Sequence, residues 1–202
     1  MTAAPLALDE ALHRACQGDI AAFRALHARF HRPMRAVDGR YLRDTESCAE
    51  VVQDSWEAIL RGAERFEGRS RLSTWVFAIV SNKARTRAQR DARSAPISAL
   101  DELDAPDELM DRFQADGHWM TPPTPWGRRA DEVVRERRAV LALLAHLDTL
   151  PEAQRAAVTL RDVEGEDPAT ICELLGVNDA HLRVLLHRGR CRLRAHLEEW
   201  TP

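Results

Sequence analysis

Basic side chains recur at helical spacing near the C-terminal end of the sequence. Arg183, His187 and Arg190 are four and three residues apart, so a helix places them on one side, with Arg188 beside them. Residues 180–197 contain five arginines and no acid. Guanidinium and imidazole groups donate hydrogen bonds to phosphates and to base edges. This stretch therefore has the chemistry needed to bind DNA.

The residues before this stretch can position it. Gly176 follows a short apolar segment and lies where a helix would end, while Asn178 and Asp179 suit the N-cap of the next helix. The following apolar residues recur at helical spacing and are expected in the core: Leu182, Leu185, Leu186, Gly189 and Leu193. We predict a helix-turn-helix over residues 167–190. The alternative is a solvated basic helix in a helical bundle.

A second basic helix is expected after a polar loop centred on Gly68. The loop spans residues 65–71, and Ser70 or Ser73 can cap the helix that follows over residues 74–90. Its expected core stripe is Leu72, Trp75, Val76, Ile79 and Val80. Cations can follow the phosphates of a single strand while a loop holds an unstacked base. The segment suits a single strand, and an ordinary solvated helix is the alternative.

An acidic stripe is expected on a helix over residues 50–60. Helical spacing separates an apolar side from a polar side. The apolar side has Cys48, Val52, Trp56, Ile59 and Leu60, and the polar side has Glu50, Gln53, Asp54 and Glu57. The polar side is either a solvated face or a docking surface for a basic partner.

The charge is divided among segments that the overall net charge of −3 conceals. Residues 61–93 hold nine basic side chains and three acids, whereas residues 101–116 hold seven acids and one arginine. The C-terminal stretch is basic again. Two basic segments separated by an acidic one are consistent with nucleic-acid binding at two places.

Periodicity throughout the chain favours helices, and we predict an all-α protein without a sheet. Two small helical domains, over residues 1–93 and 129–202, are expected on either side of a Pro-rich acidic linker at 94–128. Trp119 and Trp126 lie in this linker, where they either dock onto a domain or regulator or are simply exposed.

Other kinds of chemistry are not favoured. Pairs of potential metal ligands lie on separate expected elements without a third ligand, so we expect no metal and no other cofactor. These pairs are His27 and His31, His187 and Cys191, and His13 and Cys16. No phosphate-binding glycine loop, nucleophile elbow or HExxH motif occurs, so we expect neither enzymatic activity nor a small-molecule substrate.

The expected location is the cytoplasm. The four cysteines are far apart in the sequence and form no CxxC pair, which favours reduced thiols. The chain shows no signal-peptide pattern, and no apolar run approaches the length of a membrane span. We therefore expect no membrane insertion.

Three segments, in this order, resemble bacterial RNA polymerase sigma factors of the extracytoplasmic-function (ECF) class. The first resembles the family's D-x-E-D-x-x-Q-E-x-F-x-x-x-W helix, with matches at Glu50, Val52, Gln53, Asp54 and Trp56. The second resembles F-x-G-x-S-x-F-x-T-W-L-x-x-I-A-x-N, with matches at Phe66, Gly68, Ser70, Thr74, Trp75, Ile79 and Asn82. The third resembles L-P-x-x-x-R-x-x-x-x-L-x-x-x-x-G, with Leu150, Pro151, Arg155, Leu160 and Gly165. The resemblance covers about residues 23–93 and 133–197.

The resemblance implies a transcription initiation factor that binds core RNA polymerase and directs it to promoters. Residues 1–93 would be sigma domain two, which binds polymerase and recognises and melts the −10 element. Residues 129–202 would be sigma domain four, which recognises the −35 element. The linker at 94–128 would enter the RNA channels of the polymerase, and an anti-sigma factor would hold the protein inactive.

The resemblance also implies roles for individual residues. The β′ clamp helices of the polymerase would contact Glu50, Gln53, Asp54 and Glu57. The −10 element would be bound by Gly68, Arg69, Ser70, Trp75, Asn82, Lys83, Arg85, Arg87 and Arg90. The −35 element would be bound by Asn178, His181, Arg183, Val184, His187, Arg188 and Arg190. Departures from the family pattern at Thr86, Val184 and Leu185 leave the promoter sequence open.

The main alternative is a free-standing helix-turn-helix regulator with an N-terminal ligand-binding or dimerisation domain. It accounts for residues 167–190 but leaves the pattern at residues 66–90 without a role. Such a regulator would bind duplex DNA unaided, whereas an ECF sigma factor binds duplex DNA poorly without polymerase.

Overall fold

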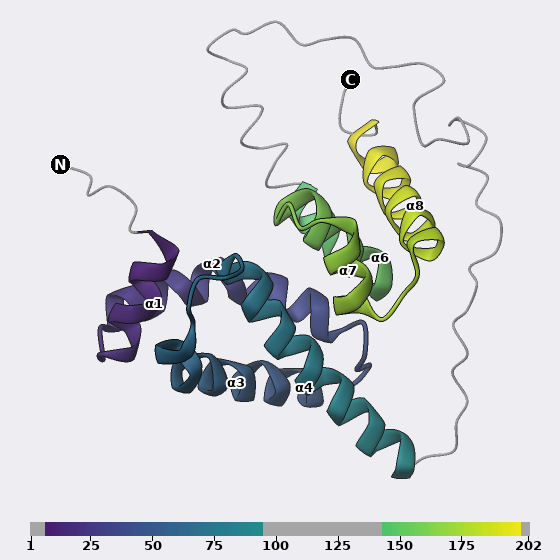
Figure 1. The fold of residues 1–202 in the computed structure, drawn as a ribbon. Coiled ribbons are helices and arrows are strands. Elements are labelled where there is room, and N and C mark those ends of the chain that lie inside the picture. The colour runs from purple at the N-terminus through teal and green to yellow at the C-terminus, as the bar shows by residue number, and fades with distance from the viewer. Residues whose placement is uncertain (1–6, 95–142, 199–202) are drawn as a thin grey trace, which may run out of the picture.

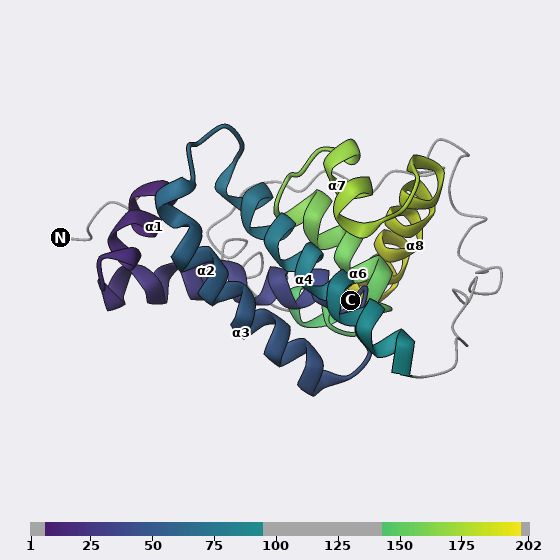
Figure 2. The same ribbon diagram turned by 60° about the horizontal axis from the view of Figure 1, so that its bottom comes forward.

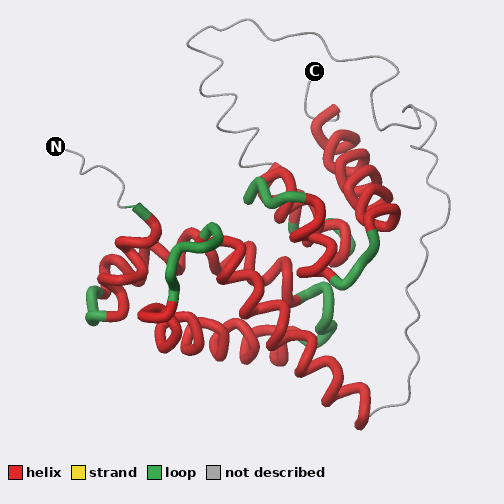
Figure 3. Tube along the Cα trace, viewed as in Figure 1, coloured by secondary structure: helices red, strands yellow, loops and turns green. Residues whose placement is uncertain are grey.

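The structure is a computed structural model that describes residues 7–94 and 143–198 (Figure 1). Within these ranges the regular elements are helices and no strand occurs (Figure 3). The prediction of an all-α protein is confirmed. The predicted linker, with its acid cluster and both tryptophans, lies outside the described residues, as does the start of the predicted C-terminal domain. No helix in the described ranges is long and apolar enough to span a membrane.

The N-terminal unit contains four α-helices. Asp19 and Asp44 cap the second and third, because each carboxylate accepts hydrogen bonds from backbone N–H groups of the first turn. These bonds hold the pKa of each carboxyl below its usual value. The elements are α1 (Leu8–Cys16), α2 (Ile20–Asp38), α3 (Thr45–Gly62), a 3-10 turn (Ala63–Arg65) and α4 (Leu72–Ser94).

The core of this unit lies between α2, α3 and α4. Phe30 of α2 and Phe77 of α4 are fully buried and meet edge to face, with ring centroids 6.1 Å apart. The predicted core stripe of α4 is only partly correct, since Trp75 and Ile79 are half-buried and Phe77 was not included. The capping prediction for Ser73 is wrong because α4 begins at Leu72, which places Ser73 inside the helix.

The C-terminal unit contains the predicted helix-turn-helix. Gly176 ends the first helix in the left-handed conformation, with φ of +64°, which allows the sharp turn. Asn178 then caps the next helix by accepting a 2.8 Å hydrogen bond from the backbone N–H of His181. The five residues expected in the core of this helix are buried. The elements are α6 (Glu152–Val158), a π-helical turn (Thr159–Val163), α7 (Pro168–Leu175) and α8 (Asp179–Glu198).

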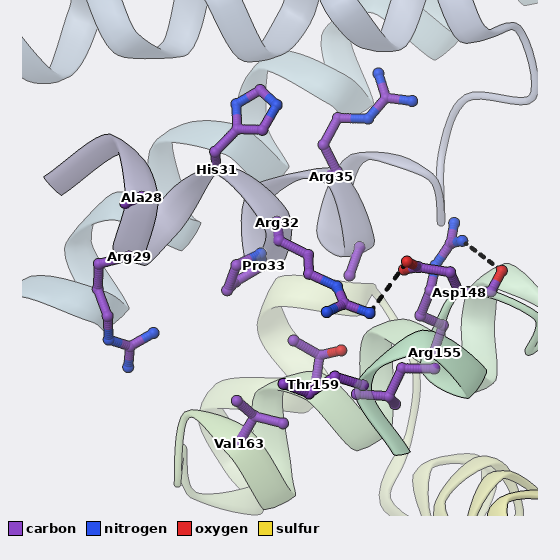
Figure 4. Close-up of a pocket in the computed structure, with 13 residues that line it drawn as sticks. Ala28, Arg29, His31, Arg32, Pro33, Arg35, Asp148, Arg155, Thr159 and Val163 are labelled. Atoms are coloured by element: carbon purple, nitrogen blue, oxygen red, sulfur yellow. Dashed lines mark hydrogen bonds and ion pairs between the residues drawn. The ribbon is translucent and has the colours of Figure 1, made fainter. Parts of the chain in front are cut away.

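The two units are in contact. Helix α7 lies beside α4, and α6 lies beside the C-terminal half of α2, as the two views in Figures 1 and 2 both show. Buried apolar residues of both units belong to one continuous cluster. A cavity of about 560 Å³ nevertheless remains between α2 and the segment around α6. In Figure 4, Arg32 reaches across this cavity to Asp148, with an N–O distance of 3.0 Å.

Candidate nucleic-acid interface

The predicted polymerase-binding residues lie on one exposed side of α3, which we call the acidic face. Cys48, Val52, Trp56 and Ile59 are buried on the opposite side, as expected, and Leu60 is half-buried. The acidic face consists of Glu50, Gln53, Asp54 and Glu57, all of them exposed. All four side chains therefore lie on the surface, where a basic partner can reach them.

Two arginines are paired with the acidic face. Arg61 donates to Glu57 over 2.6 Å, and Arg87 of α4 donates to Glu50 over 2.6 Å. Arg87 also contacts Asp91 and the Ser47 hydroxyl, and hydrogen bonding to Glu50 and Asp91 raises the pKa of its guanidinium. Arg87, predicted to contact the −10 strand, therefore contacts α3 in this arrangement.

The loop before α4 borders an open cavity of about 200 Å³. The rings of Phe66 and Trp75 lie with their centroids 5.2 Å apart at an interplanar angle of 46°. Gly68 and Ser70 are exposed, and Arg69 is paired with Glu67. The cavity is lined by Arg65, Phe66, Glu67, Arg69, Ser70 and Trp75. Aromatic rings and guanidinium groups of this kind stack on unpaired bases.

The remaining predicted −10 residues of α4 face different surroundings. Asn82 and Arg90 are exposed, and Lys83 is half-buried. Arg85 is directed at the other unit, where its guanidinium donates to the backbone carbonyl of Glu173 over 2.9 Å and to the Tyr41 hydroxyl over 3.0 Å. The structure therefore does not bring the whole predicted set onto one free surface.

Helix α8 presents several predicted −35 residues outward. Arg183 and Val184 are exposed, and Arg183 pairs with Asp179 of the same helix over 2.7 Å. Asn178 is exposed at the helix start, while His181 is half-buried. The start of a recognition helix is the part that reaches base edges in helix-turn-helix proteins.

The remaining predicted −35 residues make contacts within their own unit. Arg190 forms a two-pronged pair with Asp162, with N–O distances of 2.6 and 2.9 Å. His187 lies against Cys191, and burial together with neighbouring arginines lowers the pKa of its imidazole. Arg188 is half-buried with its Nε enclosed. Burial and the arginines thus both favour the neutral form of the His187 imidazole.

The histidine pair of α2 makes contacts with aromatic rings. His27 and His31 stack with ring centroids 4.4 Å apart, and His27 also stacks on Trp56. Within the described part of the chain, no group of three or more histidine, cysteine or acidic side chains is arranged to hold a metal ion.

Sequence reasoning missed the residues that join the two units. They include Arg29, Arg71, Ser73 and Thr74 on one side, and Glu164 and Glu166 on the other. Their partners are 92–135 residues apart in the sequence, so no local spacing connects them. The only local signal is an acid on each side of Gly165, a glycine with φ of +67°.

Comparisons with known proteins match each of the two helical units to a protein family. Residues 26–94 match the family described as Sigma-70 region 2, and residues 140–193 match Sigma-70, region 4. The ECF RNA polymerase sigma-E factor of Escherichia coli strain K12 is 25% identical over 179 residues, covering 89% of this chain and 88% of that protein. Its counterpart in Haemophilus influenzae is 27% identical over 183 residues, covering 90% and 91%.

Among solved structures, the chain is similar to the sigma factor RpoE from Bartonella quintana, determined in complex with the anti-sigma factor NepR. The sequence identity is 18%, the TM-score is 0.46, and the similarity covers 89% of this chain and 98% of that one. The two family matches together span more than half of the chain, in the same order as the two helical units. The chain belongs to the sigma-70 family, as a sigma factor of the extracytoplasmic-function class.

Proposed function

We propose that this sigma factor binds core RNA polymerase through the acidic face of α3 and directs it to promoters. The observation that carries this proposal is the exposure of all four residues of that face on a helix whose opposite side is buried. A basic partner can pair with the whole face, because surface carboxylates exchange their partners at low cost. The clamp helices of the β′ subunit are the proposed partner.

We infer that the N-terminal unit reads the −10 element as a single strand. The cavity formed by Phe66, Trp75 and the two arginines Arg65 and Arg69 suits one unstacked base. Asn82 is exposed and offers an amide that can pair with a base edge. Basic residues farther along α4, namely Lys83, Arg85, Arg87 and Arg90, would follow the strand backbone once those with protein partners are released.

The C-terminal unit is proposed to read the −35 element with the first turns of α8. Arg183 can donate two hydrogen bonds to a guanine, and the exposed Val184 can contact a thymine methyl. Asn178, His181, His187, Arg188 and Arg190 would contribute base or phosphate contacts around them. Residues 1–93 and 129–202 would thus act as the two DNA-binding domains, joined by the segment 94–128.

The proposed role needs no chemistry beyond binding. We therefore propose a protein without enzymatic activity that acts in the cytoplasm, where the polymerase is. Regulation by an anti-sigma factor is proposed from the family, because ECF sigma factors are usually held inactive in this way.

Co-purification with bacterial core RNA polymerase tests the central proposal. The test variant is Glu50→Lys/Asp54→Lys/Glu57→Lys, and the control is Asp9→Lys/Glu10→Lys/Glu173→Lys, which makes the same change in charge at exposed positions outside the acidic face. We expect wild type and control to bind and the test variant to lose binding, with helical content retained by circular dichroism.

A different outcome would leave the free-standing regulator as the better interpretation. That outcome is a purified wild-type chain that does not bind core polymerase but binds duplex DNA tightly by itself. Equal loss of binding in both triple variants would instead show that total charge, rather than the acidic face, determines the interaction.

A further inference from the structure

Two buried carboxylates of the C-terminal unit are bound by residues of the N-terminal unit. Glu164, whose side chain is fully buried, accepts hydrogen bonds from both terminal nitrogens of Arg29, over 2.6 and 2.7 Å. Hydrogen bonding to this carboxylate raises the pKa of the Arg29 guanidinium. Such a two-pronged pair is among the stronger polar contacts in proteins.

Glu166 is bound at the beginning of α4. Its two carboxylate oxygens accept hydrogen bonds from the hydroxyls of Ser73, over 2.6 Å, and Thr74, over 2.7 Å. Arg71 lies 3.8 Å from the same carboxylate and donates to the backbone carbonyls of Glu164 and Gly165. The side chain of Glu166 is only 2% exposed.

The local backbone directs both acids to the same side. The π-helical turn ends in a hydrogen bond from the N–H of Glu164 to the carbonyl of Thr159, and the N–H of Glu166 bonds to the carbonyl of Leu160. Gly165 has a positive φ that only glycine adopts without strain. We call residues Glu164, Gly165 and Glu166 the acidic latch. Every hydrogen bond that the structure gives its carboxylates comes from the N-terminal unit.

A second contact holds the other end of α7. The backbone carbonyl of Leu174 accepts hydrogen bonds from the hydroxyls of Tyr41, over 2.5 Å, and Ser81, over 2.6 Å. Ser73 and Ser81 are eight residues apart on α4, and their partners Glu166 and Leu174 are also eight residues apart. The start of α4 and the segment from Glu166 to Leu174 are therefore joined at both ends of their contact.

The groups bound by the latch are also groups that bind phosphate. A carboxylate and a phosphate both present anionic oxygens, and the first turn of a helix favours either of them. Here arginine, serine and threonine donors surround the first turn of α4, directly after the loop that forms the 200 Å³ cavity. At the far end of the contact, Arg85 is also held by the other unit.

We propose that the acidic latch keeps this sigma factor closed on itself by occupying the anion-binding start of α4, directly beside the loop proposed to hold the −10 strand, so that a promoter strand that binds there must displace the latch. The proposal rests on the proposed −10 function of the N-terminal unit. It gives the chain a means of self-inhibition that needs no second protein. The open cavity beside α2 leaves part of the boundary between the units accessible to solvent, which favours their reversible separation.

The test compares Glu164→Gln/Glu166→Gln with Asp9→Asn/Glu10→Gln in the full chain. The control removes two charges at exposed positions that make no contact with the latch. Small-angle X-ray scattering gives the radius of gyration, and fluorescence anisotropy gives the affinity for a labelled oligothymidine of twelve nucleotides at low salt. Loss of charged hydrogen bonds should shift the closed–open equilibrium at least about tenfold toward the open form.

We expect the latch variant alone to show a larger radius of gyration and about tenfold tighter binding to the oligonucleotide. An unchanged radius, or a larger radius without tighter binding, would overturn the proposal. If the latch variant does not fold, the radius of gyration of Ser73→Ala/Thr74→Val is measured instead. This variant removes the two hydroxyl donors of the N-terminal unit that bind Glu166, so its radius should also increase. Co-purification with core polymerase, measured in parallel, distinguishes a failure of this proposal from a failure of the proposed function.

Discussion

Helices α4 and α8 are the two basic helices proposed to bind DNA, but they have different surroundings. Helix α4 uses Ser73, Ser81 and Arg85 to contact the other unit, and these contacts lie along one side of the helix. Helix α8 packs on α6 and α7 of its own unit and leaves Arg183 and Val184 exposed. The closed arrangement thus covers one side of α4 and leaves the start of α8 accessible.

This difference indicates the order in which the two surfaces become available. The exposed start of α8 can approach duplex DNA without a change in the protein. The side of α4 that faces α7 becomes available only after the units separate. A sigma factor arranged in this way would couple strand binding to opening, and changes at the interface should affect α4 far more than α8.

The largest expected effect is that of pH on the stability of the protein, through one buried carboxyl group at the end of α2. Asp38, at the end of α2, is fully buried without a hydrogen-bond partner for its carboxylate oxygens. Burial raises its pKa to about 7, against the opposing effect of Arg35 and Arg155, with Glu152 adding to the rise. Burial and, to a smaller extent, the nearby Asp38 carboxylate raise the pKa of the Cys48 thiol on α3 to about 11.

We expect stability to fall as pH rises toward 7, because the folded protein binds a proton that the unfolded chain has already lost. Between pH 5 and pH 8 the free energy of unfolding of the wild type should fall by about 3 kcal/mol relative to Asp38→Asn. Urea unfolding of both proteins at each pH measures this. The histidines with lowered pKa, His31 and His187, act in the opposite direction but are common to both proteins. Parallel pH profiles would contradict the prediction.

Removing the partner of Glu164 should loosen the closed arrangement strongly. Arg29→Ala leaves a fully buried carboxylate without its arginine, at an expected cost of about 2–3 kcal/mol, moderated because Arg29 is partly exposed. Amide hydrogen exchange in residues 159–167 should become faster, while exchange in α8 changes little. Arg24→Ala on the exposed side of the same helix is the control. Equal exchange in both variants would show that the Arg29–Glu164 pair does not stabilise residues 159–167.

A contact within the C-terminal unit, between α6 and α8, should affect stability without involving the interface between the units. A Cβ added at Gly189 of α8 would lie 2.7 Å from Cγ2 of Val158 on α6. Gly189→Ala should therefore destabilise the unit by about 1–2 kcal/mol, since the gain in helix propensity offsets part of the overlap. The double variant Val158→Ala/Gly189→Ala should be less destabilised than the sum of the single variants. Thermal unfolding of the three variants measures this, and simple additivity would exclude the overlap as the cause.

The sequence was most informative where local rules determine the structure. The turn at Gly176 and the cap at Asn178 depend on neighbours within a few residues, and both were predicted. The exposure of the acidic face followed from helical spacing alone. Phe77 was missed because it adds a second buried side to α4, which a single apolar stripe does not anticipate.

The interface between the units could not be predicted in the same way. Glu164 and Glu166 are charged residues in a turn, and such residues are usually solvated. Their burial depends on Arg29 and on the start of α4, at sequence separations that no periodicity records. Ser73 illustrates the difficulty, because the hydroxyl expected to cap its own helix instead donates to another unit.

The exposed start of α8 should tolerate substitution with little change in stability. Arg183 pairs with Asp179 only at the surface, so Arg183→Ala should change the free energy of unfolding by less than about 0.5 kcal/mol. Binding of the polymerase-bound sigma factor to a promoter containing the −35 element should weaken about tenfold, because a base-contacting arginine is worth about 1–3 kcal/mol. Electrophoretic mobility shift at fixed salt measures this, with Arg24→Ala as the control. Unchanged promoter affinity would remove Arg183 from the proposed −35 surface, whereas a large loss of stability would show that α8 depends on its exposed side as α4 depends on its covered one.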